Sequence, residues 1–166
     1  MNVGIISDTH DNAAATERAV ELFREEGVET VVHCGDFVAP LLVPYFEDFE
    51  LHGVLGNNDG DAANLQAAFD SLGEESRLHG RFADLEFDGL SFAVLHGESL
   101  AEVEAIAAGE TYDYVCYGHH HRRERSERGR TTVLNPGAHF LPKSEADRTV
   151  AIVDTETESV RFHEFE

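Results

Sequence analysis

The sequence predicts a mixed α/β domain with layered sheets. Two observations carry this prediction. Short apolar runs alternate with segments of helical spacing in the first half of the chain, and apolar runs dominate the second half. Glycine-rich polar clusters repeatedly follow the apolar runs. A length of 166 residues and a hydrophobic content of 42% suit one domain, and no linker divides residues 1–166.

In the first half, apolar runs predict buried strands at residues 2–6, 28–34 and 51–55. Between the first two strands, Asn12 suits the N-cap of a helix that Gly27 would end. Residues 39–47 predict only a weak helix, because Pro44 lies inside it. A further helix is expected over residues 61–72. The order of these elements favours parallel strands joined by helices.

The second half begins with a predicted hairpin around the strong turn signal Asp88-Gly89. Its strands are residues 81–87 and 90–95. A helix over 99–108 follows, and the remaining strands are expected at 112–117, 131–134, 149–153 and 159–165. The run from Arg122 to Arg130 is the one locally basic stretch. It is interpreted as a solvated hairpin of mixed charge, with an anion-steering rim or a subunit contact as alternatives.

The chain is strongly acidic, with 33 Asp and Glu against 12 Lys and Arg, and Lys143 is its single lysine. This pattern is typical of proteins from salt-loving organisms, and an acidic mesophilic protein is the alternative. Such charge argues against coating nucleic acid or binding an anionic membrane. Cys34 and Cys116 are expected as buried free thiols. The absence of a long apolar segment and of a signal-like N-terminus predicts a cytoplasmic protein.

Five polar clusters share one position, because each follows a predicted strand. They are Asp8-Thr9-His10, Gly35-Asp36, Gly56-Asn57-Asn58-Asp59, His96-Gly97 and Gly118-His119-His120-His121. Loops beyond the carboxyl ends of strands converge on one edge of an α/β sheet, so these side chains are expected to meet. Asp8 and His10 are spaced by two and would point the same way from an extended segment, as would His119 and His121.

The donor types in these clusters are carboxylates, imidazoles and one carboxamide, and no thiolate is required. Nitrogen and oxygen donors suit Mn, Fe, Ni, Co or Zn better than Ca or a structural zinc. No single cluster is specific, but the ordered set of five is. The sequence therefore predicts a metal site.

The ordered set resembles the calcineurin-like metallophosphoesterase superfamily and, in its short length and third motif, the small YfcE-like phosphodiesterase family. The resemblance runs from Asp8 to Asp154 and includes Ser7-Asp8-Thr9-His10 and Leu134-Asn135-Pro136-Gly137. With the acidity, it suggests a haloarchaeal member. The family's fold implies two mixed β-sheets packed face to face and flanked by helices, a four-layer sandwich.

The resemblance implies two divalent metal ions, manganese being the first expectation and Ni, Fe, Co or Zn the alternatives. Asp8, His10 and His121 would hold one ion. Asn57, His96 and His119 would hold the other, and Asp36 would bridge both. A hydroxide shared by the ions, ~3.5–4 Å apart, would attack a small phosphodiester in line. The expected catalytic residues are Asp36, Asn57 and Asn58.

Asn58 stands where many superfamily members have a histidine that is thought to assist the leaving group. Its absence favours esters whose leaving groups depart easily, and so a phosphodiesterase. The alternatives are a phosphomonoesterase or protein phosphatase, and a non-catalytic scaffold similar to a retromer subunit. Asp11 and His120 are smaller departures, where glycine and threonine are common in the family. A homodimer or higher homo-oligomer is an open expectation.

Several other polar residues are interpreted mainly as structural or surface residues. His33, His52, His79, His139 and His163 are expected to be structural or exposed, although His139 could border the substrate pocket. His120 is expected to point away from the metals. Asp59 suits a turn or a helix cap. Arg148 is a weak candidate for contact with an anionic substrate.

Overall fold

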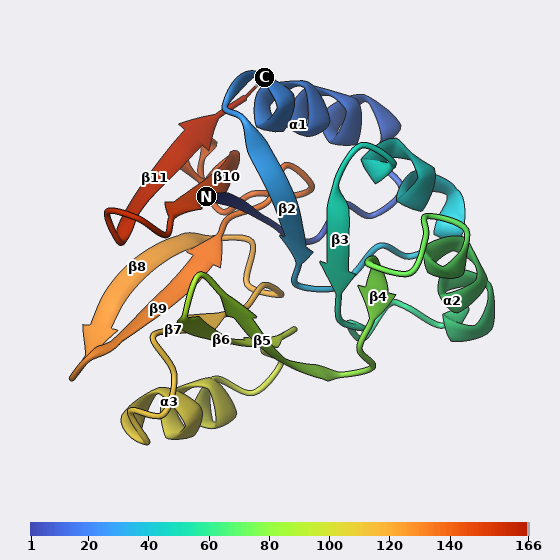
Figure 1. Ribbon diagram of the computed structural model, residues 1–166. Coiled ribbons are helices and arrows are strands. Elements are labelled where there is room, and N and C mark those ends of the chain that lie inside the picture. The colour runs from blue at the N-terminus through green and yellow to red at the C-terminus, as the bar shows by residue number, and fades with distance from the viewer. Residues whose placement is uncertain (166) are drawn as a thin grey trace.

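The computed structural model describes residues 1–165, and its strands form two sheets. The first sheet, in the order β11-β10-β1-β2-β3-β4, contains β1 Asn2–Ile6, β2 Val28–His33, β3 Glu50–Gly53, β4 Arg77–Leu78, β10 Thr149–Asp154 and β11 Ser159–Glu164. The second, in the order β5-β6-β7-β9-β8, contains β5 Phe82–Phe87, β6 Leu90–Leu95, β7 Tyr114–Cys116, β8 Arg123–Arg128 and β9 Thr131–Pro136. Figure 1 shows both sheets.

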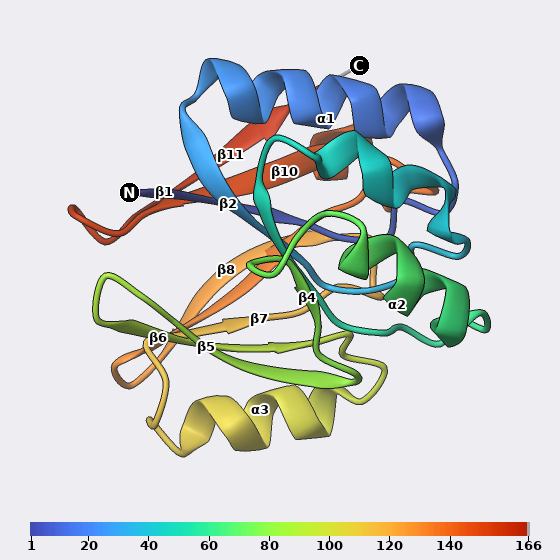
Figure 2. The ribbon, with the colours of Figure 1, turned by 45° about the vertical axis from the view of Figure 1, so that its right-hand side comes forward.

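Helices cover the outer faces of the two sheets (Figure 2). They are α1 Ala13–Glu25, α2 Ala62–Asp70 and α3 Leu100–Ala108, with the short 3₁₀ helices η1 Pro40–Phe46 and η2 Glu145–Asp147. α1, η1 and α2 pack on the first sheet, and α3 packs on the second. This arrangement confirms the predicted fold of two mixed sheets flanked by helices. Within residues 1–165, no helix has the length and apolar character needed to cross a membrane.

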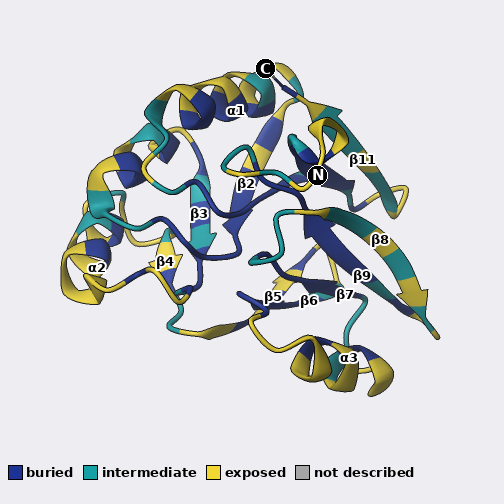
Figure 3. Cartoon of the chain, turned by 180° about the vertical axis from the view of Figure 1, so that it is seen from behind, coloured by how far each residue is buried: buried dark blue, intermediate teal, exposed yellow. Residues whose placement is uncertain are grey.

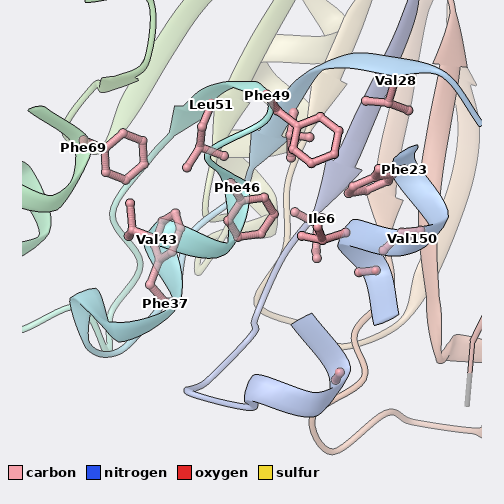
Figure 4. Close-up of a cluster of buried hydrophobic side chains, with 14 of the residues drawn as sticks. Ile6, Phe23, Val28, Phe37, Val43, Phe46, Phe49, Leu51, Phe69 and Val150 are labelled. Carbon is pink, nitrogen blue, oxygen red and sulfur yellow. The ribbon is translucent and has the colours of Figure 1, made fainter. Parts of the chain in front are cut away.

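Three apolar layers hold these elements together. Phe23, Phe46 and Phe69 join the helices to the outer face of the first sheet (Figure 4). The layer between the sheets includes Ile5 and Phe92, both completely buried. A smaller third layer lies under α3. Because apolar burial contributes roughly 25 cal/mol per Å², these layers dominate the stability of the fold and fix the strand ends in place.

The parallel strands bring the predicted site loops to one edge of the molecule. β1, β2 and β3 are parallel neighbours, and so are β6, β7 and β9. Backbone pairing continues beyond the ends of β1 and β2, since Asp8 N donates to Gly35 O at 2.9 Å and His10 N donates to Asp36 O at 3.1 Å. These bonds hold the first two site loops against each other.

The structure differs from the predicted elements in ways that have local causes. Residues 40–46 form a 3₁₀ helix, because Pro44 has no N–H for an α-helical bond. α2 and β7 are shorter than the predicted 61–72 and 112–117. β4 was not predicted because two residues carry no periodic pattern. β8 pairs only with β9 and forms the expected hairpin; its charged sequence suits an exposed sheet edge, whereas β9 is largely buried (Figure 3).

Candidate metal centre

The predicted ligands adopt an unusual backbone conformation. Asp8, His10, Asp36, His119 and His121 all have positive φ, between 43° and 64°. Asp8 and His10, and likewise His119 and His121, were expected to point the same way because their segments would be extended. The backbone is not extended at these residues, so that reason was wrong. Left-handed turns, which Asp, Asn and His tolerate better than most residues, aim the side chains into one place.

Asp8 is the buried centre of one donor set. His121 Nε2 lies 3.2 Å from Asp8 Oδ1, and His10 Nε2 lies 3.7 Å from the same oxygen. One donor atom from each of these three residues lies within 4.8 Å of the others. Ser7 Oγ and the backbone N of His119 donate to the other oxygen, Asp8 Oδ2. The Asp8 carboxylate is thus fixed on one side and faces the imidazoles on the other.

Asp36 lies between this set and a second group of donors. Its Oδ2 is 3.2 Å from His10 Nε2 and 3.4 Å from His96 Nε2. His119 Nδ1 lies 3.3 Å from His96 Nε2 and 3.0 Å from Asn57 Oδ1. The structure therefore brings all seven predicted ligands into one cluster, with Asp36 in its middle.

Outer hydrogen bonds determine which imidazole nitrogens face this cluster. His96 Nδ1 lies 2.7 Å from Cys34 O, and His121 Nδ1 lies 3.1 Å from Leu141 O. A carbonyl can only accept, so both Nδ1 atoms carry hydrogen, and in the neutral rings both Nε2 lone pairs face inward. This is the arrangement that supports histidine ligands in metal sites.

The inward-facing atoms fit a bound cation. His119 Nδ1 faces the lone pair of His96 Nε2 and the oxygen Asn57 Oδ1, and without a hydrogen on this nitrogen the three acceptors would repel one another. His10 Nε2 is buried and lies 3.2 Å from Asp36 Oδ2. A proton or a metal ion between such atoms removes the repulsion. Because the donors are imidazole nitrogens and carboxyl or amide oxygens, they suit a divalent transition metal.

The carboxylates and imidazoles also shift each other's protonation. Burial acts to raise the pKa of Asp8 and Asp36, but the hydrogen bonds of the surrounding imidazoles outweigh it and hold both pKa values well below the usual range. Burial lowers the pKa of His10, yet the two carboxylates raise it overall to about 9. The metal-free cluster therefore holds protons that a metal ion would displace.

Asp59 has a larger role than the predicted turn or cap. Its Oδ2 accepts from the backbone N of Asp36 at 2.8 Å and of Gly56 at 2.7 Å. Its Oδ1 accepts from Val38 N at 2.7 Å. The buried Asp59 carboxylate thus ties the loop after β2 to the loop after β3. An acid in a polar loop was visible in the sequence, but its partners 21 and 23 residues away were not.

His33 contacts Thr9, between two of the predicted ligands, and has the structural role that was expected. It is completely buried and stacks on Phe37 at 3.6 Å between ring centroids. Gly35 N donates to its Nδ1, so its Nε2 carries the hydrogen and donates to Thr9 Oγ1, both at 3.1 Å. Burial lowers the pKa of His33 to about 3. The ring is therefore neutral and holds Thr9, between Asp8 and His10, by a defined tautomer.

We expect His33 to remain neutral, with hydrogen on Nε2, from pH 8 to about 4. The unfolded chain binds this proton below about pH 6.5, whereas the folded chain does not. The contribution of His33 to stability therefore falls as the pH drops from about 6.5 towards 3. Nitrogen-15 spectra of the imidazoles would test this, with exposed imidazoles as internal controls. A His33 ring that titrates near pH 6.5 would contradict it.

The other candidate residues lie around the centre in different roles. His120 Nε2 donates to Gly97 O at 3.0 Å, so this ring points away from the cluster, as predicted. His139 stacks on Phe165 and contacts Asn12, which caps α1 as expected. Arg148 lies beside Glu145. Contact of His139 or Arg148 with a substrate stays a prediction.

Phe140 was missed by the sequence analysis. Its ring stacks on His10, with centroids 4.3 Å apart, and lies edge-on to His121 at 6.0 Å. The carbonyl of the next residue, Leu141, fixes the His121 tautomer. The loop after β9 thus covers one side of the centre. No motif marks this loop, because its relation to His10 depends on tertiary packing.

Comparisons with known proteins identify the family of this chain. The family model for the calcineurin-like phosphoesterase superfamily domain matches residues 1–158. The phosphodiesterase MJ0936 of Methanocaldococcus jannaschii is 36% identical, over 97% of this chain and 97% of its own. The phosphodiesterase YfcE of Escherichia coli K12 is 25% identical, over 96% of this chain and 91% of its own.

Solved structures extend the comparison to the fold. A structure described as a novel archaeal phosphodiesterase has a TM-score of 0.89 and 36% identity, covering 98% of this chain and 99% of its own. Vps29 of Entamoeba histolytica, complexed with zinc, has a TM-score of 0.65 and 19% identity, covering 98% and 97%, and so shares the fold alone. The chain belongs to the calcineurin-like phosphoesterase superfamily and, within it, to the YfcE-like family.

Proposed function

We propose that this protein is a metal-dependent phosphodiesterase with two divalent ions. Asp8, His10 and His121 hold one ion, and Asn57, His96 and His119 hold the other. The observation that carries the proposal is the position of Asp36, whose Oδ2 lies 3.2 Å from His10 Nε2 and 3.4 Å from His96 Nε2. A carboxylate between two donor sets is suited to bridge two ions. The names of the phosphodiesterase relatives support the reaction class.

The bound ions would supply positive charge to the phosphoryl oxygens and lower the pKa of the attacking water. The chain's own residues set the geometry of this reaction. Asn58 donates to Asp36 through its backbone N at 2.9 Å and its side-chain amide at 2.8 Å, which fixes the bridging carboxylate. His96 and His121 are held by backbone carbonyls. The site is thus preorganised before a substrate arrives.

The same position of Asn58 limits proton donation to the leaving group. An amide N–H donates a hydrogen bond but not a proton, so a weakly basic leaving group is favoured. Phosphodiesters and activated esters are therefore better substrates than alkyl monoesters. This argues against a phosphomonoesterase or protein phosphatase. The complete set of donors argues against a scaffold that acts only through protein contacts.

We expect Asn58→His to raise kcat/KM for esters with poor leaving groups. An imidazole at this exposed position can protonate the departing oxygen, and a general acid of this kind contributes ~10²-fold or more. The measurement is the dependence of kcat/KM on leaving-group pKa across a series of aryl and alkyl diesters, which should become shallower. Asn58→Ala is the control, since it removes the side-chain bond to Asp36 without adding an acid. An unchanged dependence in Asn58→His would count against this account of Asn58.

Metal-dependent turnover of bis(p-nitrophenyl) phosphate tests the proposed function directly. The protein, stripped with a chelator, should be inactive and should recover with Mn²⁺, the first expectation, or with Ni, Fe, Co or Zn. Turnover of p-nitrophenyl phosphate under the same conditions should be slower. A metal-loaded, folded protein that hydrolyses neither ester would support the scaffold instead. The assays should span low to molar salt, because the acidic composition leads us to propose a halophilic, cytoplasmic protein.

A further inference from the structure

A groove with a volume of about 1150 Å³ lies beside the metal centre, between α3 and the edge strand β8. Its apolar part is formed by Leu100 and Val103 of α3 and by Tyr117. Leu100 is 49% exposed, which is unusual for a large aliphatic side chain on this protein. Its polar part includes Arg122 and Lys143. The groove therefore combines an apolar wall with cationic side chains.

Two of the four cations that line the groove are free of ion pairs, whereas Arg123 pairs with Glu164 at 3.5 Å and Arg125 lies 3.9 Å from Glu127. Neither Arg122 nor Lys143 has a side-chain hydrogen bond or ion pair within residues 1–165. Glu104, in contrast, pairs with Arg128 at 2.7 Å. Asp147 accepts from Arg123 N at 2.9 Å and from Ser144 Oγ at 2.7 Å, and Glu124 accepts from Ser126 Oγ at 2.6 Å. An anion entering the groove would meet two cations, Arg122 and Lys143, that have no competing partner within residues 1–165.

This distribution of charge contrasts with the rest of the acidic surface. Of the 12 Lys and Arg residues in the chain, four line the groove: Arg122, Arg123, Arg125 and Lys143. A cleft near β3 is lined by the acids Glu29, Glu47, Asp48, Glu50, Glu74 and Glu75 and by no Lys or Arg. With the acids Glu104, Glu124 and Asp147 also in its lining, the groove has nearly balanced charge and is less repulsive to a small anion than the cleft.

The groove adjoins the chain segment that carries two of the predicted metal ligands, although no predicted ligand lines it. Arg122 follows His121 in the chain, and Lys143 N donates to His121 O at 3.1 Å. His120, which lines the groove, has its ring 5.0 Å from that of His119. The two cations are thus anchored on the same ligand segment. The groove is therefore placed to receive a part of the substrate other than the reacting phosphoryl group.

We propose that the groove binds the part of the substrate beyond the reacting phosphodiester, an inference that rests on the proposed phosphodiesterase function. The substrate class is a nucleotide-like diester that carries a second anionic group. Its organic part packs against Leu100 and Tyr117, and its second anion is bound by Arg122 and Lys143. The net charge of −21 disfavours a long polyanion, so a small molecule fits better than a nucleic-acid strand.

The test compares two substrates with the same leaving group. One is the p-nitrophenyl ester of thymidine 5′-phosphate, and the other is the same ester with a 3′-phosphate. The wild-type protein should favour the 3′-phosphorylated ester, measured as a ratio of kcat/KM values. Arg122→Gln and Lys143→Gln should each reduce that ratio by about fivefold, and the double variant should bring it close to one. Because both esters are assayed on one preparation, folding and metal loading cancel in the ratio.

Arg18→Gln is the matched control, because Arg18 is an exposed cation on α1 that pairs with Glu21. It should leave the ratio unchanged. The preference should also weaken as salt is raised, since the Debye length falls to ~3 Å at 1 M. A wild-type ratio near one, or a ratio that the double variant does not change, would overturn the groove assignment. Failure to hydrolyse bis(p-nitrophenyl) phosphate would instead overturn the proposed function.

Discussion

Asp36→Asn is expected to lower kcat/KM for bis(p-nitrophenyl) phosphate by on the order of 10³-fold or more. The carboxylate lies between both donor sets, so its loss weakens both proposed ion sites together. Asparagine is the informative replacement, because Asp36 has a φ of 61° and asparagine tolerates this left-handed conformation. Alanine would add backbone strain to the loss of charge. Activity and metal content per chain should be measured on the same sample.

The matched control for Asp36→Asn is Asp61→Asn. Asp61 caps α2 through a bond from Asn64 N, and asparagine is an equally good N-cap. This control makes the same chemical change outside the centre and should keep both activity and metal. If Asp36→Asn retained full activity at matched metal content, Asp36 could not bridge the ions.

Asp59→Ala is expected to reduce the free energy of unfolding of the metal-free protein by about 3–5 kcal/mol. The substitution leaves the backbone N–H groups of Asp36, Gly56 and Val38 without their acceptor, at a cost of roughly 1–3 kcal/mol for each buried group. Val38 adds to the effect, since a β-branched residue with a φ of 79° is strained and depends on this bond. Urea unfolding in the presence of a chelator measures the loss without any contribution from metal.

Asp48→Ala provides the comparison for Asp59→Ala. Asp48 is an exposed acid that pairs with Arg24, and removing such a pair typically costs less than about 1 kcal/mol. Asp59→Asn should fall between the two, because its amide keeps one acceptor oxygen. Equal unfolding free energies for Asp59→Ala and Asp48→Ala would show that solvent replaces the three bonds at little cost.

Local pattern predicted a mixed α/β domain with a cluster of donors after its strands, and the resemblance to the metallophosphoesterases supplied the two sheets packed face to face. Apolar runs located β1, β2 and β6, and the parallel order of strands brought the polar residues that follow them to one edge. The sequence could not predict contacts that depend on tertiary packing. The bonds from Asp59 to the loop of Asp36 and the stacking of Phe140 on His10 are of this kind. Their role as supports for metal ligands follows from the structure.

The edge strand β8 lies in the run that was interpreted as a solvated hairpin, but no apolar alternation marks its bounds. Its sequence, RERSER, alternates charge rather than apolar and polar character, because both of its faces are at least partly exposed. A strand at a sheet edge needs only one hydrogen-bonded neighbour, and charge protects it from pairing with other chains. The basic run therefore serves as sheet structure and, in our proposal, places Arg122 at the mouth of the groove.

The left-handed backbone at the centre also constrains how this protein can evolve. Asp, Asn and His are enriched several-fold at positive φ among residues other than glycine, and they are also the residue types that bind transition metals. At Asp8, His10, Asp36, His119 and His121, backbone conformation and metal binding thus favour the same small set of amino acids. A substitution at any of these positions must therefore satisfy the backbone and the proposed metal site together. Substitutions at Asn58 and in the groove, where no positive φ restricts the choice, are therefore the expected route by which new substrate preferences arise on this fold.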